Sequence, residues 1–203
     1  LGPDAQKRSR GELVLEALQT LQDRERAQEE ANRRQQMSAL EDQLRRQPQD
    51  PVLGNPEGEI VLVEFFDYAC GYCKRIHPVL KEAVARRGNI RWVMKEFPIL
   101  GENSVLAARF SLAASKLGDY EAFHDALMSH RGRLGPGAMQ RAAETAGIDF
   151  DSLQQVAQEP WVEQTIARNH QLAQALGIRG TPYMFVGDET VPGFVDADQL
   201  EEI

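Results

Sequence analysis

Cys70 and Cys73 are the only cysteines of this 203-residue chain, and they enclose Gly71 and Tyr72 in the segment Cys-Gly-Tyr-Cys. As a structural cross-link the pair would be weak, because a four-residue loop contributes roughly 2 kcal/mol against nearly 5 for a hundred-residue loop. At the start of a helix, however, the first thiol would lie beside unsatisfied N–H groups and the positive end of the helix dipole. That position lowers its pKa from about 8.5 and makes it a nucleophile. The pair therefore favours redox chemistry over a structural disulfide or a metal site alone.

The composition limits the function classes. The net charge is −8 and hydrophobic residues make up 42% of the chain. An acidic balance argues against nucleic acid as a partner, because nucleic-acid binding needs a basic surface. No run approaches eighteen apolar residues, so no membrane span is expected. The chain starts at Leu1 with neither a basic nor an apolar stretch, so no signal peptide is expected in it.

The first part of the chain, residues 1–47, is predicted to form a helical arm. From about residue 10 it is rich in Leu, Ala, Gln, Glu and Arg, without Pro or aromatic residues. Its apolar residues fall at helical spacings in two groups on either side of the charged segment 22–36. Such a helix is either a solvated arm or an oligomerisation stalk, and the first apolar group favours the stalk. That group is Leu13, Val14, Ala17, Leu18 and Leu21.

Pro and Gly residues over 48–56 predict a linker, after which a catalytic domain is expected over 57–203. Two apolar segments, 60–66 and 90–97, predict strands, and the residues between them predict a helix over 74–87 that Pro78 interrupts. A strand, a helix and a strand in this order predict parallel pairing with a right-handed crossover. The fold class is therefore α/β.

A block of helices is predicted after the second strand, over about residues 101–176. Gly residues separate its members, and two short strands over 183–187 and 190–195 then predict a hairpin. The start of one more helix is expected over 196–203. The helices predicted in the block cover 103–117, 120–129, 137–146, 149–157 and 160–176.

The segment Phe65-Phe-Asp-Tyr-Ala-Cys-Gly-Tyr-Cys-Lys-Arg-Ile-His-Pro78 resembles the active-site segment of the thioredoxin fold. The helical block resembles the insertion found in the Dsb family of bacterial oxidoreductases, and residues 177–185 are similar to that family's cis-proline segment. The similarity covers residues 57–203. The arm before it departs from the family's monomeric oxidant and looks most like the suppressor-of-copper-sensitivity C (ScsC) proteins. The resemblance implies a thioredoxin fold with a large helical insertion, preceded by an N-terminal helical oligomerisation arm.

The resemblance also implies roles for matching residues. Cys70 would be the exposed nucleophile that forms a mixed disulfide, and Cys73 would attack that disulfide and release the substrate. Gly71 and Tyr72 would tune the redox potential. The Thr181–Pro182 bond would be cis and would face the sulfur pair; the alternative is an ordinary trans proline that opens a strand.

Glu64 lies in the middle of an apolar strand, where a carboxylate is costly unless it is paired or used. It is either a side chain that reaches solvent past the sheet edge or, as we favour, a buried acid beneath Cys73 that accepts its proton. The family places a lysine near this acid, and Lys95 is the matching residue. A buried Lys–Glu pair would titrate as a coupled unit. A surface position for Lys95 remains open.

Metal binding is the weaker possibility. His77 follows Cys73 by four residues on the same predicted helix, so it either faces the sulfurs as a ligand or is a half-exposed helix residue, which is the commoner case. Cu(I) favours soft thiolates, and a reduced Cys70/Cys73 pair offers two of them. This copper reading depends on the resemblance rather than on spacing.

Taken together, the resemblance implies a periplasmic thiol–disulfide oxidoreductase whose substrates are client proteins with disulfides. The arm favours an oligomeric disulfide isomerase, because several nucleophilic thiols around a shared space hold one client more effectively. A trimer is preferred over a dimer because the arm resembles that of the ScsC proteins. A membrane-bound thiol reductase would keep it reduced, and no resident cofactor is required. Two alternatives stay open: a dithiol oxidase with the arm as a tether, and a Cu(I)-binding or relay protein that uses the same cysteines.

Overall fold

A computed structural model describes residues 10–187, 189–196 and 199, with several side chains of the N-terminal helix left undescribed. The chain divides into two units, Leu1–Gln43 and Leu44–Ile203. The predicted domain boundary at residue 57 therefore falls thirteen residues inside the second unit, and the reason lies in residues 44–54, described below.

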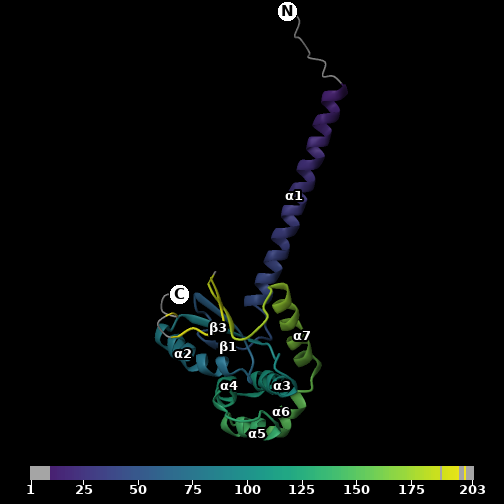
Figure 1. The fold of residues 1–203 in the computed structure, drawn as a ribbon. Coiled ribbons are helices and arrows are strands. Elements are labelled where there is room, and N and C mark those ends of the chain that lie inside the picture. Colours follow the sequence, from purple (N-terminus) through teal and green to yellow (C-terminus); the bar gives the residue numbers. More distant parts are fainter. Residues whose placement is uncertain (1–9, 188, 197–198, 200–203) are drawn as a thin grey trace, which may run out of the picture. The chain divides into compact units, whose positions relative to one another are not determined.

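The described part of the first unit is helix α1, which runs from Arg10 to Arg45 (Figure 1), so its last two residues in sequence, Leu44 and Arg45, belong to the second unit. The predicted helix is thus present. Of the apolar group proposed for self-association, the structure describes the side chain of Leu21, which is 53% exposed. The side chains of Leu13, Val14, Ala17 and Leu18 lie outside the described residues. Oligomerisation through this group stays a prediction.

The second unit is built on a five-stranded sheet in the order β1-β3-β2-β4-β5. Strands β2 and β3 pair in parallel, as the strand–helix–strand order predicts, and the other neighbours pair antiparallel. The hairpin of β4 and β5 is also confirmed. The strand bounds are Val52–Gly54 for β1, Ile60–Phe66 for β2, Ile90–Glu96 for β3, Tyr183–Val186 for β4 and Glu189–Pro192 for β5.

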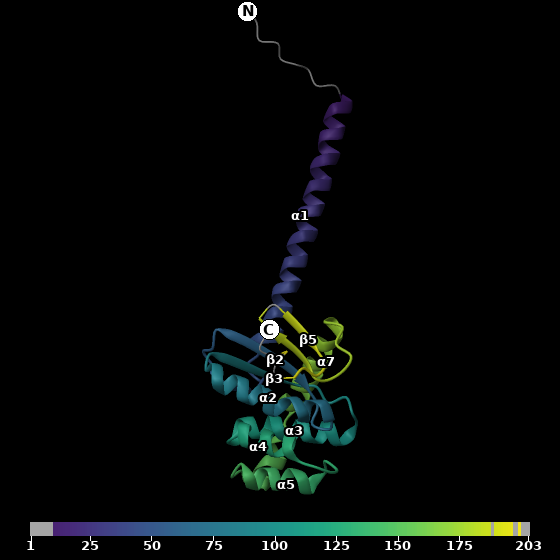
Figure 2. The same cartoon turned by 60° about the vertical axis from the view of Figure 1, so that its left-hand side comes forward.

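Helices cover both faces of the sheet. Helix α2 begins at Gly71 and continues to Arg87 without a break at Pro78, so the predicted interruption was wrong. The inserted helices α3, α4 and α5 lie below the sheet in both views (Figures 1 and 2). The remaining bounds are Glu102–Leu117 for α3, Tyr120–Ser129 for α4, Pro136–Thr145 for α5, Phe150–Val156 for α6 and Pro160–Ala175 for α7. This is the thioredoxin fold with a large helical insertion.

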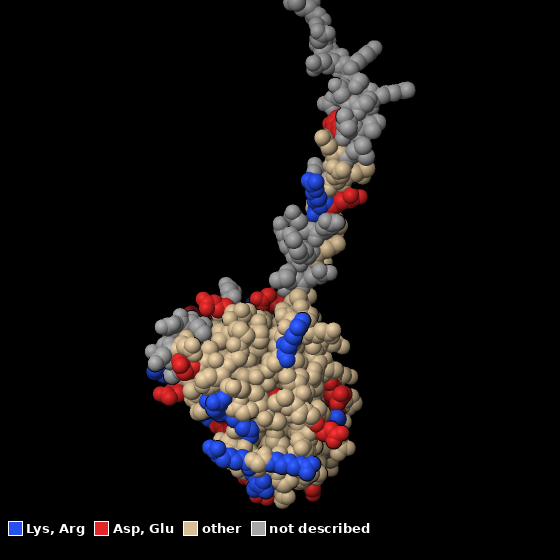
Figure 3. All heavy atoms as spheres, in the orientation of Figure 1, with Lys and Arg blue, Asp and Glu red and all other residues tan. Residues whose placement is uncertain are grey.

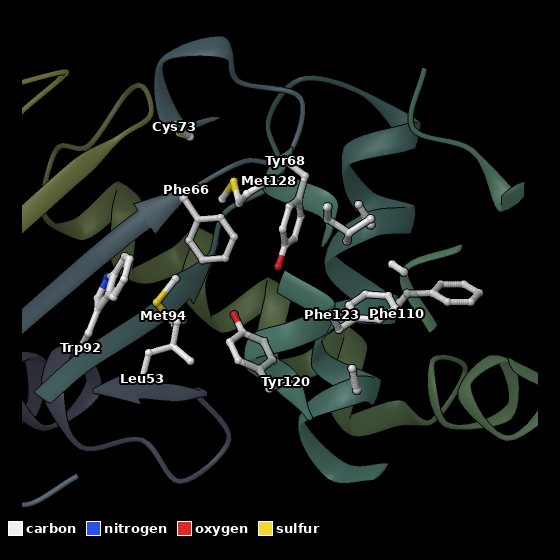
Figure 4. Packing of buried hydrophobic residues seen from close by; sticks show 14 of the residues in the cluster. Leu53, Phe66, Tyr68, Cys73, Trp92, Met94, Phe110, Tyr120, Phe123 and Met128 are labelled. Carbon is white, nitrogen blue, oxygen red and sulfur yellow. The ribbon is translucent and has the colours of Figure 1, made fainter. Parts of the chain in front are cut away.

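The alternation of side chains along β2 and β3 decides which residues meet. The register pairs Glu64 with Met94 and Phe65 with Lys95. Since paired residues share a face and successive residues alternate, Glu64 lies on the face of Met94 and Lys95 lies on the opposite face. The face of Met94 packs against α2 and the insertion. Figure 4 shows Phe66, Trp92 and Met94 within this core, beside aromatic residues of α3 and α4.

Residues 48–56 are not the linker that their Pro and Gly content predicts. They contain β1, which pairs antiparallel with β3 through Val52 and Val93. Leu44 and Asp50 before it are buried, and the guanidinium of Arg45 donates to the carbonyl oxygen of Gly187. The second unit therefore begins before the Pro-rich segment. A three-residue strand is too short to give a periodic signal.

Two further predictions concern the C-terminal helix and a membrane span, and both can be compared only with the described residues. Of the helix expected over 196–203, the structure describes residues 196 and 199. Among the described helices, none is long and apolar enough to cross a membrane. The face of the second unit seen in Figure 3 carries both acidic and basic side chains, with Lys and Arg gathered in its lower part.

Candidate active site

The two cysteines lie at the start of α2, where the loop from β2 turns into the helix. Cys70 is the N-cap residue, and its sulfur accepts a hydrogen bond from the backbone N–H of Cys73 at 3.4 Å. Both cysteines are free thiols, Cys70 7% exposed and Cys73 fully buried. Gly71 and Tyr72 between them are exposed. The outer thiol is thus the one that a substrate can approach.

The cap position and the neighbouring thiol separate the two pKa values. A hydrogen bond from the Cys73 thiol is the largest influence on Cys70, and together with Thr181 and the N–H groups of Cys73 and Tyr72 it lowers the pKa of Cys70 to about 5. Burial acts in the opposite direction and is outweighed. Burial raises the pKa of Cys73 far above its usual range, and the neighbouring Glu64 raises it further. At neutral pH Cys70 is a thiolate and Cys73 is a thiol.

Thr181 and Pro182 lie against the nucleophile. The peptide bond between them is cis, as the resemblance implies. When protonated, the Cys70 thiol donates to the carbonyl oxygen of Thr181 at 3.3 Å. The carbonyl oxygen of Pro182 accepts from the N–H of Gly193 at 2.9 Å, which ties this loop to the residue after β5.

Asp67 organises the loops around the cysteines. Its buried carboxylate accepts backbone hydrogen bonds from Ala69 at 2.7 Å, Ile99 at 2.8 Å and Leu100 at 2.9 Å. One side chain therefore fixes both the turn before Cys70 and the loop after β3. Asp67 is not among the predicted site residues, although its position directly after an apolar strand is a signal for one.

Glu64 is the buried acid that we favoured in the sequence. Its side chain is 1% exposed, and burial raises its pKa to about 8. One carboxylate oxygen accepts a hydrogen bond from the indole N–H of Trp92 at 3.1 Å. The thiolate of Cys70 adds to the rise in its pKa, which places Glu64 within electrostatic reach of the sulfur pair. The alternative, a side chain that reaches solvent at the sheet edge, is wrong.

Lys95 does not pair with Glu64, and the alternative of a surface lysine is also wrong. Its side chain is fully buried on the other face of the sheet, where its ammonium forms an ion pair with Asp50. Arg168 of α7 approaches the same carboxylate at 3.5 Å. Successive side chains of a strand point to opposite faces of the sheet. Met94 is the register partner of Glu64 and shares its face, so Lys95, the next residue, points to the other face. Asp50 was missed because it falls in the supposed linker.

His77 does not complete a metal site with the sulfurs. Its Nε2 lies 2.7 Å from a carboxylate oxygen of Asp125, and its ring lies 5.7 Å from that of Trp92. It is also buried rather than half-exposed. In the part of the chain that the structure describes, no three His, Cys, Asp or Glu side chains are grouped as a metal site would need. The two thiols are therefore the donors that a soft cation would meet here.

A second buried network lies further along the same face. The hydroxyl of Tyr68 lies 3.2 Å from a carboxylate oxygen of Glu96 and 2.7 Å from Nδ1 of His124. Figure 4 shows the hydroxyls of Tyr68 and Tyr120 pointing toward one another. Burial lowers the pKa of His124 well below its usual value, so this histidine is neutral at pH 7.

Tyr72, between the two cysteines, lies in a small exposed cluster with Arg75 and Phe194. The guanidinium carbon of Arg75 lies 4.3 Å from the ring centroid of Tyr72 and 5.4 Å from that of Phe194. Both rings are exposed, Tyr72 by 55% and Phe194 by 38%. A protein substrate that reaches Cys70 would meet this surface.

Comparison with known proteins agrees with this geometry. A family model of the DsbA-like thioredoxin domain matches residues 61–203. A thioredoxin-like oxidoreductase from Silicibacter pomeroyi DSS-3 is 46% identical, with a TM-score of 0.76 over 79% of this chain and 93% of its own. A periplasmic thioredoxin-like protein from Salmonella enterica serovar Typhimurium is 32% identical, with a TM-score of 0.71 over 81% of this chain and 92% of its own.

Two further matches differ in how much of each chain they cover. ScsC from Proteus mirabilis in a transitional conformation is 30% identical, with a TM-score of 0.73 over 95% of this chain and 87% of its own. The Na(+)/H(+) antiporter NhaA 3 of Salinispora tropica is 28% identical over 139 residues, which are 68% of this chain and 21% of the antiporter. The chain spans about a fifth to a quarter of the length of the curated antiporters it matches.

Proposed function

The chain belongs to the family of DsbA-like thioredoxin domains, and from that membership we propose that it is a periplasmic thiol–disulfide oxidoreductase that works as an oligomeric disulfide isomerase. The observation that carries the thiol–disulfide exchange in this proposal is the difference between the two thiols. Cys70 caps α2 with a pKa of about 5, while Cys73 is fully buried and its pKa is raised. Cys70 can therefore attack a disulfide as a thiolate, while Cys73 stays protonated until a later step.

The first chemical step is nucleophilic. The Cys70 thiolate attacks one sulfur of a client disulfide, a new S–S bond forms between Cys70 and the client, and the client's other sulfur leaves as a thiolate. Isomerisation follows when another client thiolate attacks the same mixed disulfide and releases Cys70 unchanged. No net electron transfer takes place in this cycle.

The second chemical step resolves a mixed disulfide between Cys70 and the client that no client thiolate has attacked. Glu64, as carboxylate, takes the proton of the Cys73 thiol, and the resulting thiolate attacks the sulfur of Cys70. The client sulfur leaves as a thiolate, so the client disulfide has been reduced by two electrons, and a Cys70–Cys73 disulfide remains. A thiol reductase, which we propose to be membrane-bound, must then return two electrons to the pair.

The arm supports the isomerase over a simple oxidant. Helix α1 is 36 residues long and Leu21 on it is exposed. An oligomer held by such helices presents several Cys70 thiolates to one client. The similar ScsC structure covers 95% of this chain. We propose a homotrimer on that likeness, and the periplasm on the likeness to the Salmonella protein.

The test compares the full chain with a variant that lacks residues 1–43, the first unit. Sedimentation velocity measures the mass of each, and the reactivation of ribonuclease with scrambled disulfides measures isomerisation. We expect the full chain to sediment as an oligomer and to reactivate the substrate, and the shortened chain to be a folded monomer that reactivates it poorly. A monomeric full chain, or a shortened chain with full isomerase activity, refutes the oligomeric isomerase.

A dithiol oxidase is the second candidate, and the low pKa of Cys70 favours it. A stabilised thiolate stabilises the reduced pair, so the disulfide form becomes a stronger oxidant. Oxidation of a reduced dithiol peptide by the disulfide form separates the two. An oxidase would act equally well with and without residues 1–43.

A further inference from the structure

The buried acid of the site has an unusual set of partners. One oxygen of Glu64, Oε2, accepts from the indole N–H of Trp92 at 3.1 Å. The other, Oε1, is buried and has no hydrogen-bond partner among the described residues. Buried polar oxygens are nearly always satisfied, so an unpartnered one at a reactive site calls for an explanation. An oxygen that receives the proton of a neighbouring thiol during turnover must be kept available.

Strand geometry makes Trp92 the residue able to hold Glu64. Trp92 pairs in register with Leu62, two residues before Glu64, so the indole lies diagonally next to the carboxylate on the same face. Lys95 lies on the opposite face and is paired with Asp50. The donor to Glu64 is therefore a neutral N–H group and not an ammonium.

The indole is itself held in place. Trp92 is 1% exposed, and the ring of His77 lies against it with centroids 5.7 Å apart. Asp125 fixes His77 through its Nε2 at 2.7 Å, and Lys81 contacts the same carboxylate. His77 follows Cys73 by one helical turn in α2. The helix that carries the thiols thus also supports the donor.

We propose that Trp92 is a positioning residue for thiol exchange: its N–H holds Oε2 of Glu64 so that Oε1 stays available to the Cys73 proton. The proposal deepens the function given above and depends on it. It assigns to Trp92 no contact with substrate. The same hydrogen bond lowers the pKa of Glu64 against the effect of burial, so its loss leaves less carboxylate at neutral pH.

The test follows the second step of thiol exchange as a function of pH. Reduced protein is mixed with a peptide disulfide whose retained half carries a fluorophore, and fluorescence anisotropy reports when Cys73 releases that half. For the parent we expect release to rise with pH around a midpoint near 8, the pKa of Glu64. In Trp92→Phe the midpoint should move up by about one pH unit, with release roughly tenfold slower at pH 7, because a hydrogen bond to a charged group is lost.

Matched variants separate positioning from packing. Trp161, the second of the two tryptophans, donates to Glu159 at 2.6 Å away from the thiols, so Trp161→Phe removes the same kind of bond and should leave the midpoint unchanged. Glu64→Gln should abolish the midpoint, and adding Trp92→Phe to it should slow release no further. If Trp92→Phe misfolds, a second variant tests the same bond. In a Trp161→Phe background Trp92 is the one remaining tryptophan, and its replacement by benzothienylalanine changes the indole N–H to sulfur while the shape of the ring is kept.

The outcomes distinguish this inference from the function on which it rests. An unchanged midpoint in a folded Trp92 variant, or additive slowing in the double variant, overturns the positioning role while thiol exchange persists. A parent that forms no mixed disulfide with the peptide overturns the oxidoreductase itself. The attack by Cys70 precedes the step at Glu64, so the first phase should stay unchanged in Trp92→Phe.

Discussion

Glu64→Gln should make the protein more stable and less active, because the buried acid is costly to the fold. Glu64 has a usual pKa of 4.5, and burial raises it to about 8 in the folded state. Between these values the folded protein holds a proton that the unfolded chain has released. The free energy of unfolding therefore falls progressively as the pH rises from 4.5 to 8. The contribution of the protonated acid to stability is fully present only below pH 4.5.

The size of the effect follows from the shift. Each pH unit within this window changes the free energy of unfolding by about 1.4 kcal/mol, so the ionisable side chain costs about 5 kcal/mol by pH 8. Gln does not titrate, and its amide oxygen can still accept from Trp92. The free energy of unfolding of Glu64→Gln minus that of the parent should thus be nearly constant below pH 4.5 and rise by several kcal/mol toward pH 8.

Urea denaturation from pH 4 to pH 8 measures this difference. Both proteins should carry Cys70→Ser and Cys73→Ser, so that no thiol titrates in the same window. Glu159→Gln is the matched control, since Glu159 also accepts from a tryptophan but its pKa is lowered. A difference that stays constant from pH 4 to pH 8 would refute the assignment of Glu64 as a neutral buried acid. In the parent background the same substitution should slow the release of mixed disulfides.

Further outcomes are expected for the cysteines, for the buried ion pair and for copper. Cys73→Ser should accumulate mixed disulfides with client proteins on non-reducing gels while Cys70→Ser does not, and thiolate-specific alkylation of the reduced parent should show a midpoint near pH 5. Since that pKa is depressed from 9.0, the reduced fold should gain stability over the oxidised one as the pH rises from 5 to 9 and lose it as the pH falls through 5. Lys95→Met should lower the free energy of unfolding by about 3–5 kcal/mol, as breaking a buried ion pair does. Lys116→Met, at the exposed pair with Glu159, should change it far less. Slowed thiol exchange with unchanged stability would contradict the structural role of Lys95. If the reduced thiols hold Cu(I), either cysteine-to-serine change should abolish competition with a Cu(I) chelator, and retained competition would place copper elsewhere.

The sequence alone determined the features that depend on neighbouring residues. Two cysteines after an apolar run predicted a thiol pair at a helix start, because the strand signal and the helix-forming residues are local. The parallel pairing of β2 and β3 followed from their order along the chain, and the Thr181–Pro182 segment was identified by its resemblance to the family. These predictions needed no knowledge of which side chains meet.

The tertiary structure decided every question of which side chains meet. The register of β2 against β3 puts Glu64 beside Trp92 and sends Lys95 to the other face, and a shift of one residue would reverse both statements. The burial that raises the pKa of Cys73 comes from a core that includes residues distant in the chain, such as Met184. Asp50 lies in a segment with no periodic signal, and it was identified only as the partner of a buried lysine. A sequence shows which residues alternate along a strand, but not where one strand stands against the next.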